Sequence, residues 1–237
     1  PYVSKDDKEE EVLKKIFSAN VKALRDTLEG VDKKAFKKAI SLINSAEKIF
    51  IYGIGTSAFL ANEFQYRLLL LGYNAHMFTD AVKMRTSSII IGKNDLVIGI
   101  SHTGRTSFVC DSVKCAKDNG AKTLCITSIE KSTLYDMCDV GLVTTSDEIN
   151  YPVEALSARI AQLSLLEAIT AAVSLKSYDD AIHANNDSTL ENSTAPKGNI
   201  TINGGVITVY SNDDGLHADG TMTINGGSVT ISNSYEG

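Results

Sequence analysis

The chain has 237 residues, 43% of them hydrophobic, which is enough to bury a core in one sizeable domain with an appendage. Its 23 basic and 29 acidic residues give a net charge of −6, which argues against binding nucleic acid or an anionic membrane through bulk electrostatics. No run approaches the ~18 apolar residues that span a bilayer, so no membrane partner is expected.

Two amphipathic helices are predicted at the start of the chain, within residues 1–46, and we expect them to pack on the domain that follows. Residues 8–29 place large apolar side chains on one stripe. Phe36, Ala39, Ile40 and Ile43 repeat the pattern in a second helix. The stripe of the first helix consists of Leu13, Phe17, Val21, Leu24 and Leu28.

From residue 47 to residue 184, short apolar runs alternate with helical patterns, which predicts a doubly wound parallel α/β sheet. The expected strands are residues 48–52, 75–78, 95–100, 122–127 and 140–143. A long helix follows over residues 152–174, with its inward side chains taken as Val153, Leu156, Ile160, Leu163 and Leu166. Apolar residues nearly encircle that helix, which favours a subunit interface, with burial inside one domain as the alternative.

Residues 185–197 have the Asn-, Ser- and Thr-rich composition of a linker, and residues 198–237 contain an internal repeat. The segment from Ile200 to Gly205 recurs as Met222 to Gly227. Alternating Thr and Ile with Asn-Gly-Gly corners predict a short β-solenoid-like tail of about two rungs. This tail can be a fused or truncated piece.

Two glycine-punctuated turns rich in Ser and Thr carry the functional signal. The 53–57 turn follows the first expected strand, and the 101–106 turn follows the third. Hydroxyls and unpaired N–H groups at a strand-to-helix turn suit a phosphate or sugar hydroxyls. Helix capping by Ser and Thr is the alternative interpretation.

The ordered series of these motifs resembles the SIS (sugar isomerase) domain of RpiR-type transcription regulators, over roughly residues 8–184. The matching pieces include the 53–58 and 100–106 segments, Ile126-Thr127-Ser128 and the segment from Glu154 to Leu163. The resemblance implies a five-stranded sheet in the order 2-1-3-4-5, with ligands in the crevice between the first and third strands. No cofactor is expected.

The resemblance also implies which residues bind a sugar phosphate. Arg105 is as readily a solvent-exposed side chain as a phosphate ligand, and Arg159 is interpreted as a structural partner. Glu154 would bind sugar hydroxyls in a regulator. The ligand-binding candidates are Gly55, Thr56, Ser57, Ser101, His102, Thr103, Gly104, Thr106 and Glu154.

The favoured function is effector sensing in a cytoplasmic regulator of carbohydrate metabolism, as a homodimer or homotetramer. DNA would be bound only through a helix-turn-helix module that is absent from this sequence. The alternative is an aldose–ketose sugar-phosphate isomerase that uses Glu154 as its base, with His102 as a second acid or base, so enzyme activity stays open with a leaning against it.

The tail resembles carbohydrate-binding β-helix proteins of bacterial surfaces, over roughly residues 198–237. This second resemblance implies a secreted or surface origin, in conflict with a cytoplasmic sensor, and offers carbohydrate adhesion as another alternative. Asp213, Asp214 and Asp219 are conceivable calcium ligands, although turn-forming Asp beside Gly is the simpler interpretation and no metal is otherwise expected.

Overall fold

The computed structural model describes residues 3–145, 156–177, 182–184, 198–210, 216–218 and 220–232. These residues fall into two compact units, divided between Val173 and Ser174. The candidate ligand site lies in the first unit, so the fold of that unit comes first.

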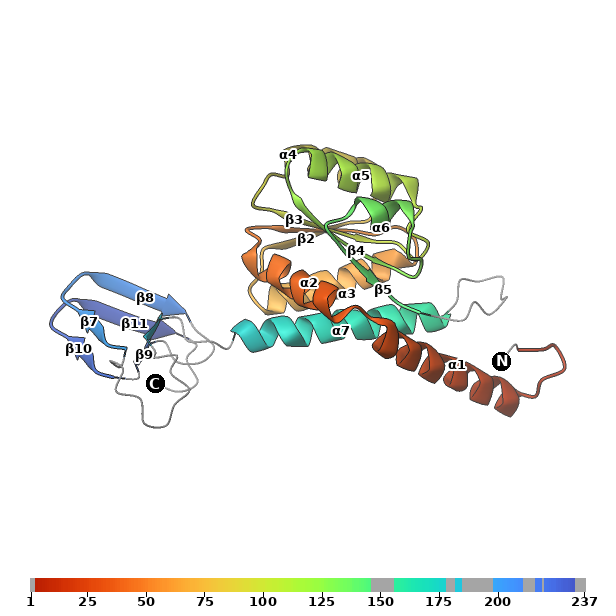
Figure 1. The fold of residues 1–237 in the computed structure, drawn as a ribbon, viewed down its shortest axis with the longest axis horizontal. Helices are drawn as coiled ribbons and strands as arrows, with labels where there is room; N and C mark the ends of the chain where they lie inside the picture. Colours follow the sequence, from red (N-terminus) through yellow and green to blue (C-terminus); the bar gives the residue numbers. More distant parts are fainter. Residues whose placement is uncertain are drawn as a thin grey trace. The chain divides into compact units, whose positions relative to one another are not determined.

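The first unit is built on a five-stranded parallel sheet in the order β2-β1-β3-β4-β5 (Figure 1). Both the parallel sheet and the strand order expected from the family resemblance are confirmed. The predicted strands agree with the observed ones to within one residue. The strands are β1 (Ile49–Tyr52), β2 (Ala75–Phe78), β3 (Leu96–Ile100), β4 (Lys122–Thr127) and β5 (Val140–Val143).

Helices cover both faces of the sheet (Figure 1). One face carries α2 (Lys33–Ser45), α3 (Ser57–Leu70) and α7 (Leu156–Ser177), whereas the other carries α4 (Ala81–Ile90), α5 (Ser107–Asp118) and α6 (Thr133–Met137). Successive strand residues point to opposite faces, so β1 sends Ile49 and Ile51 into the first core and Phe50 and Tyr52 into the second. Double burial explains why β1 and β3 are continuous apolar runs rather than alternating ones.

The helix α1 (Glu9–Gly30) forms where the sequence predicts it, but its large apolar stripe is not buried in the chain. Leu13, Phe17, Val21 and Leu28 are 60%, 64%, 53% and 75% exposed. The buried residues of α1 are small ones, and Thr27 joins the helix to the end of the sheet through two hydrogen bonds with Thr145. The packing of α1 therefore leaves an apolar surface open.

The helix α7 is confirmed over residues 156–177, whereas the predicted residues 152–155 lie outside the described part of the chain. The inward assignment of Leu163 is wrong, because this side chain is 40% exposed. Small residues and a buried glutamine, Gln162, face the sheet instead. Ala158 and Ala161, in the first two turns of α7, are buried as well.

The second unit consists of short strands paired in parallel, two by two. The repeated segments lie side by side, with Ile200 opposite Met222 and Val206 opposite Ser228. Pairs of this kind do not by themselves establish a β-solenoid, so that expectation stays a prediction. The strands are β6 (Ile182–Ala184), β7 (Ile200–Ile202), β8 (Val206–Tyr210), β9 (Leu216–Ala218), β10 (Met222–Ile224) and β11 (Ser228–Ser232).

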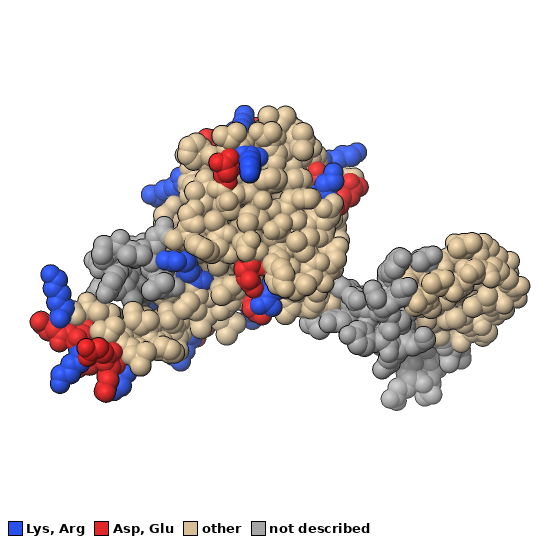
Figure 2. All heavy atoms as spheres, turned by 180° about the vertical axis from the view of Figure 1, so that it is seen from behind, with Lys and Arg blue, Asp and Glu red and all other residues tan. Residues whose placement is uncertain are grey.

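Charged side chains of both signs are interspersed on the face of the molecule seen in Figure 2, without a broad basic patch over the described residues there. The helices in the described part of the chain are all too short or too polar to cross a bilayer. The mixed surface charge agrees with the 23 basic and 29 acidic residues of the sequence. The helices agree with its lack of a long apolar run.

Candidate functional site

The two polar turns lie next to each other because the strands that precede them are paired. Tyr52, the last residue of β1, lies opposite Gly99, which is one residue before the end of β3. The 53–57 turn then leads to α3 on one face of the sheet, and the 101–106 turn leads to α5 on the other. This is a topological switch point, where open parallel sheets commonly bind their ligands.

The 101–106 turn is folded by its own hydroxyl groups. The Ser101 hydroxyl accepts a hydrogen bond from the Gly104 N–H at 3.1 Å and lies 2.9 Å from the Thr106 hydroxyl. Ser101 is 2% exposed, whereas Thr103 lies on the surface of the turn. Thr106 is the N-cap residue of α5, yet its side chain makes no capping hydrogen bond. Helix capping therefore does not explain the Thr106 hydroxyl.

Gly104 is required by both the conformation and the packing of the 101–106 turn. Its φ of +62° lies in the left-handed region, which a residue with a Cβ adopts at a cost. A Cβ at this position would also collide with the side chain of Ser132. The N–H of Gly104 bonds to Ser101 and its carbonyl accepts from the Leu134 N–H at 2.9 Å. The backbone of this turn is thus fixed against α6.

The 53–57 turn is shaped by two glycines with different constraints. A Cβ on Gly53 would lie 2.7 Å from the carbonyl oxygen of Ser57, so only glycine fits there without rearrangement. Gly55 has a φ of +63°, but open space surrounds its Cβ position. Thr56 is the N-cap residue of α3 and does not cap it through its side chain. Ser57 begins α3 and is buried.

A hydrogen-bonded network continues from the 101–106 turn along the carboxyl edge of the sheet. His102 Nδ1 lies 3.1 Å from the Ser128 hydroxyl, which is 2.8 Å from the Thr144 hydroxyl. Gln162 of α7 donates through Nε2 to the same Ser128 oxygen at 3.2 Å. His102, a candidate for ligand binding or ring opening, is therefore held by the hydroxyl of Ser128, the residue that follows β4.

The sequence prediction did not assign a site role to Ser128, Thr144 or Gln162. Ser128 follows β4 and Thr144 follows β5, so both lie at the same edge of the parallel sheet as the two turns. Their position directly after predicted strands is the signal that could have found them. Gln162 has no such signal, because its contact depends on how α7 packs.

Other predicted site residues are not part of the described structure. Glu154, the candidate carboxylate for sugar binding or base catalysis, lies outside the described residues. The calcium candidates Asp213, Asp214 and Asp219 lie outside them as well. Within the described ranges no group of three or more His, Cys, Asp or Glu side chains could hold a metal ion.

The cysteines of the second core are thiols without a ligand role in the described structure. A hydrogen bond with Cys138, together with burial, raises the pKa of Cys125 far above its ordinary value. Burial likewise raises the pKa of Cys110. Because a thiolate is the nucleophilic and metal-binding form, these groups are inert at neutral pH.

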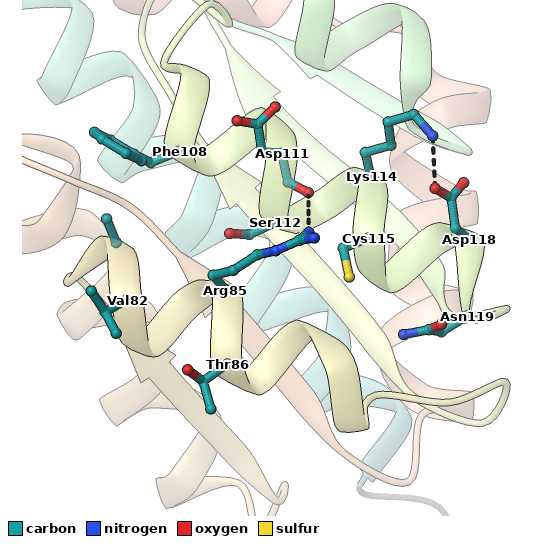
Figure 3. Close-up of a pocket in the computed structure, with 11 residues that line it drawn as sticks. Val82, Arg85, Thr86, Phe108, Asp111, Ser112, Lys114, Cys115, Asp118 and Asn119 are labelled. Atoms are coloured by element: carbon teal, nitrogen blue, oxygen red, sulfur yellow. Dashed lines mark hydrogen bonds and ion pairs between the residues drawn. The ribbon is translucent and has the colours of Figure 1, made fainter.

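A groove of about 790 Å³ runs between α4 and α5 (Figure 3). Its cationic side chains are already engaged. Arg85 donates to the carbonyl oxygen of Asp111 at 3.5 Å, and Lys114 pairs with Asp118 at 2.7 Å. The switch point concentrates more hydroxyl and N–H groups than this groove, so we take it as the candidate anion site.

Fold and site together define a doubly wound α/β domain with a hydroxyl-lined switch point. Residues 42–172 match the model of the SIS domain, and the chain belongs to the SIS domain family. The resemblance predicted from the motifs is thereby confirmed. Residues 186–237 match a second model, described as a carbohydrate-binding domain-containing protein.

Two curated relatives are HTH-type transcriptional regulators. An uncharacterised one from Thermotoga maritima is 32% identical over 70% of this chain and 60% of its own length. RpiR of Escherichia coli K12 is 28% identical over 74% of this chain and 60% of its own length. The chain spans between 60% and 65% of the length of the first curated relatives that it matches.

The solved structures confirm the fold. The Vibrio vulnificus NanR protein complexed with ManNAc-6P superposes with a TM-score of 0.67, at 24% identity, over 73% of this chain and 64% of NanR. At that identity the superposition establishes a shared fold. The ligand in its structure is a property of NanR.

Proposed function

We propose that residues 47–184 form the phosphosugar-sensing SIS domain of a cytoplasmic RpiR-type regulator of carbohydrate metabolism. The observation that carries the proposal is the 101–106 turn, whose hydroxyls and glycine lie at the switch point of the sheet. The relatives named HTH-type transcriptional regulators support the regulatory role. DNA would be bound by a helix-turn-helix module of the whole regulator.

In this proposal the phosphate of the ligand lies over the 101–106 turn, near Ser101, Thr103 and Thr106. The start of α5 contributes N–H groups and partial positive charge. Thr56 and Ser57, at the start of α3, reach the sugar or the far side of the phosphate. Ligand binding would shift the arrangement of subunits, and so of the DNA readers.

Ser101→Ala is expected to abolish the response of the chain to a phosphosugar, because the Ser101 hydroxyl organises the turn over which the proposed phosphate lies. A thermal-shift panel of phosphorylated hexoses, pentoses and amino sugars, including ManNAc-6P, measures this. A ligand at 100 times its Kd stabilises the wild type by about 2.7 kcal/mol, which raises the Tm visibly. Ser41→Ala on α2 is the matched control, since the Ser41 hydroxyl donates within its own helix, to the carbonyl oxygen of Lys37.

A panel in which no phosphosugar raises the Tm of the wild type at millimolar concentration contradicts the proposal. Incubation with the binding sugar and analysis for its isomer then separates a sensor from an isomerase. The tail match favours carbohydrate binding as a second candidate function. Neutral polysaccharides are therefore included, and binding that survives Ser101→Ala would assign that activity to the tail.

We also propose that the chain forms a homodimer or homotetramer through the apolar stripe of α1. Four large side chains of that stripe are more than half exposed, which costs solvation free energy unless a second surface covers them. Phe17→Lys is expected to lower the molar mass measured by sedimentation velocity, because it introduces a charge into the covered surface. Glu29→Lys, exposed on the same helix, should leave the mass unchanged. A monomeric wild type at micromolar concentration contradicts this proposal.

A further inference from the structure

Arg159, in the first turn of α7, presents a buried donor that has no acceptor. Its Nε is buried and makes no hydrogen bond within the described part of the chain. By contrast, Arg67 and Arg85 each donate to an oxygen atom of the protein. A buried charged donor without an acceptor costs free energy, so native structures supply one from the protein, from water or from a ligand. Interpreting Arg159 as a structural partner does not account for this donor.

Arg159 lies on the stripe of α7 that faces the sheet. Residues spaced three and four apart share one face of a helix, and this stripe runs through Arg159, Gln162, Leu166, Ile169 and Val173. The last three are buried in the core, and Gln162 is 1% exposed. Arg159 therefore continues the buried stripe of α7 towards the N-terminus of the helix.

The position of Arg159 along α7 brings it to the hydroxyl network. Gln162 lies three residues after Arg159, which is almost one helical turn. Its side chain donates to Ser128, the residue that follows β4. Helical side chains point towards the N-terminus of their helix, so the guanidinium reaches beyond the Gln162 contact. Ser128 in turn bonds to His102 of the 101–106 turn.

The first turns of α3 and α7 lie at the same edge of the sheet. Arg67 Nη1 pairs with Glu167 Oε1 at 3.4 Å, and each of these residues lies about three turns into its helix. Both helices follow a strand of the parallel sheet and so begin at its carboxyl edge. Arg159 is thus near the level of the 53–57 turn, on the face of the sheet that α3 covers.

We propose that Arg159 binds phosphoryl oxygens of the ligand from the α7 side of the switch point. This inference rests on the proposed function and adds the charge that the hydroxyl groups lack. A phosphomonoester carries about −1.5 to −2 charges at pH 7, whereas the Ser and Thr hydroxyls are neutral donors. A guanidinium can bind two phosphate oxygens at once, which makes the site selective for phosphorylated sugars over neutral ones.

Calorimetric titration of the full chain with ManNAc-6P and with inorganic phosphate tests the assignment. Arg159→Gln is expected to weaken binding of both probes about tenfold to a hundredfold, because one charge-assisted contact is lost. Arg159→Lys should recover part of the affinity. Arg85→Gln is the matched control, since Arg85 lies in the α4–α5 groove and should leave binding unchanged.

The pH dependence separates ligand binding from a structural role. The second pKa of a phosphomonoester is about 6, so wild-type affinity should rise from pH 5 to pH 7.5 as the dianion forms. This rise should shrink in Arg159→Gln, which a structural defect would not produce, and the melting curve without ligand checks that the variant folds.

One outcome overturns this inference and leaves the sensing function standing. In it, ManNAc-6P binds to Arg159→Gln as tightly as to the wild type, whereas Ser101→Ala abolishes its binding. Loss of binding in Arg85→Gln instead also overturns it. If neither ManNAc-6P nor inorganic phosphate binds to the wild type, the inference about Arg159 is overturned as well. The wider phosphosugar panel then decides whether the chain has the sensing function.

Discussion

Gly104→Ala is expected to destabilise the first unit by about 2–5 kcal/mol and to abolish phosphosugar binding. The left-handed conformation costs a residue with a Cβ roughly 1–2 kcal/mol. The collision with Ser132 adds an overpacking cost of about 1–3 kcal/mol, because α6 holds that side chain in place. A thermal melt should show a drop in Tm of roughly 5–15 °C.

Gly55→Ala is the matched control for this variant. Gly55 has nearly the same φ, +63°, but nothing lies within 4 Å of its Cβ position. Gly55→Ala should therefore lose only the stability that the left-handed conformation costs, about 1–2 kcal/mol. Equal losses of stability in the two variants would show that the contact between the 101–106 turn and α6 does not constrain Gly104.

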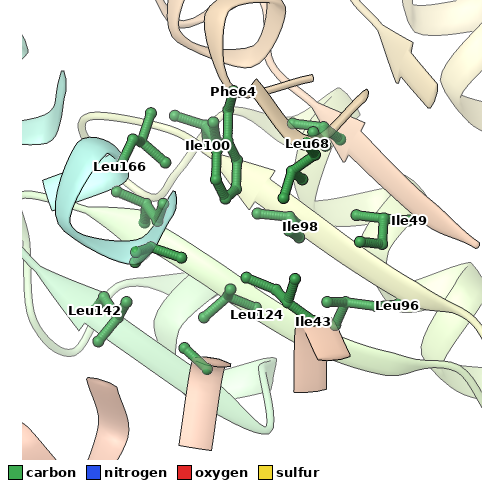
Figure 4. Close-up of a cluster of buried hydrophobic side chains, with 14 of the residues drawn as sticks. Ile43, Ile49, Phe64, Leu68, Leu96, Ile98, Ile100, Leu124, Leu142 and Leu166 are labelled. Carbon is green, nitrogen blue, oxygen red and sulfur yellow. The ribbon is translucent and has the colours of Figure 1, made fainter. Parts of the chain in front are cut away.

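Phe64→Ala is expected to cost about 3–5 kcal/mol, the largest effect of a single truncation in this core. Phe64 is fully buried on α3 and lies among the side chains that join α3, the sheet and α7 (Figure 4). Its removal would leave a cavity next to Leu68, Ile100 and Leu166, which the helices close only in part. Urea or thermal unfolding measures the loss.

Phe59→Ala, on the same helix, provides the comparison. Phe59 is 75% exposed in the chain, so its truncation should change stability by no more than about 0.5 kcal/mol. A loss of several kcal/mol in Phe59→Ala would mean that a second surface covers this residue in solution. A loss below about 1 kcal/mol in Phe64→Ala would contradict the packing of α3 described here.

The sheet could be predicted from the sequence because its central strands are buried on both faces and short apolar runs recur between helical segments. The runs at 75–78, 122–127 and 140–143 match β2, β4 and β5 residue for residue, since turns and helix stops bound them sharply. The helix α4 was predicted only through the alternation of strands and helices, without bounds of its own. Its apolar residues do not form one stripe, and Val82 and Ile90 remain 73% and 80% exposed. Periodicity identifies a helix only when its two faces differ.

The inward face of α7 was predicted wrongly at Leu163 for a related reason. A helix that is apolar nearly all round does not reveal which of its sides meets the sheet. Of the candidate site, the sequence predicted both turns, because hydroxyls and glycines directly after strands are a local signal. The network in which His102 and Gln162 each bond to Ser128 depends on three separate segments and could not be predicted locally.

A crystal structure of the chain grown with ManNAc-6P tests the central claim most directly. We expect the phosphoryl group within hydrogen-bond distance, about 2.7–3.2 Å, of donors in the 101–106 turn. The Ser101 or Thr106 hydroxyl should be among these donors. A phosphoryl group in the α4–α5 groove, with the 101–106 turn empty, would contradict the assignment of the switch point as the phosphosugar site.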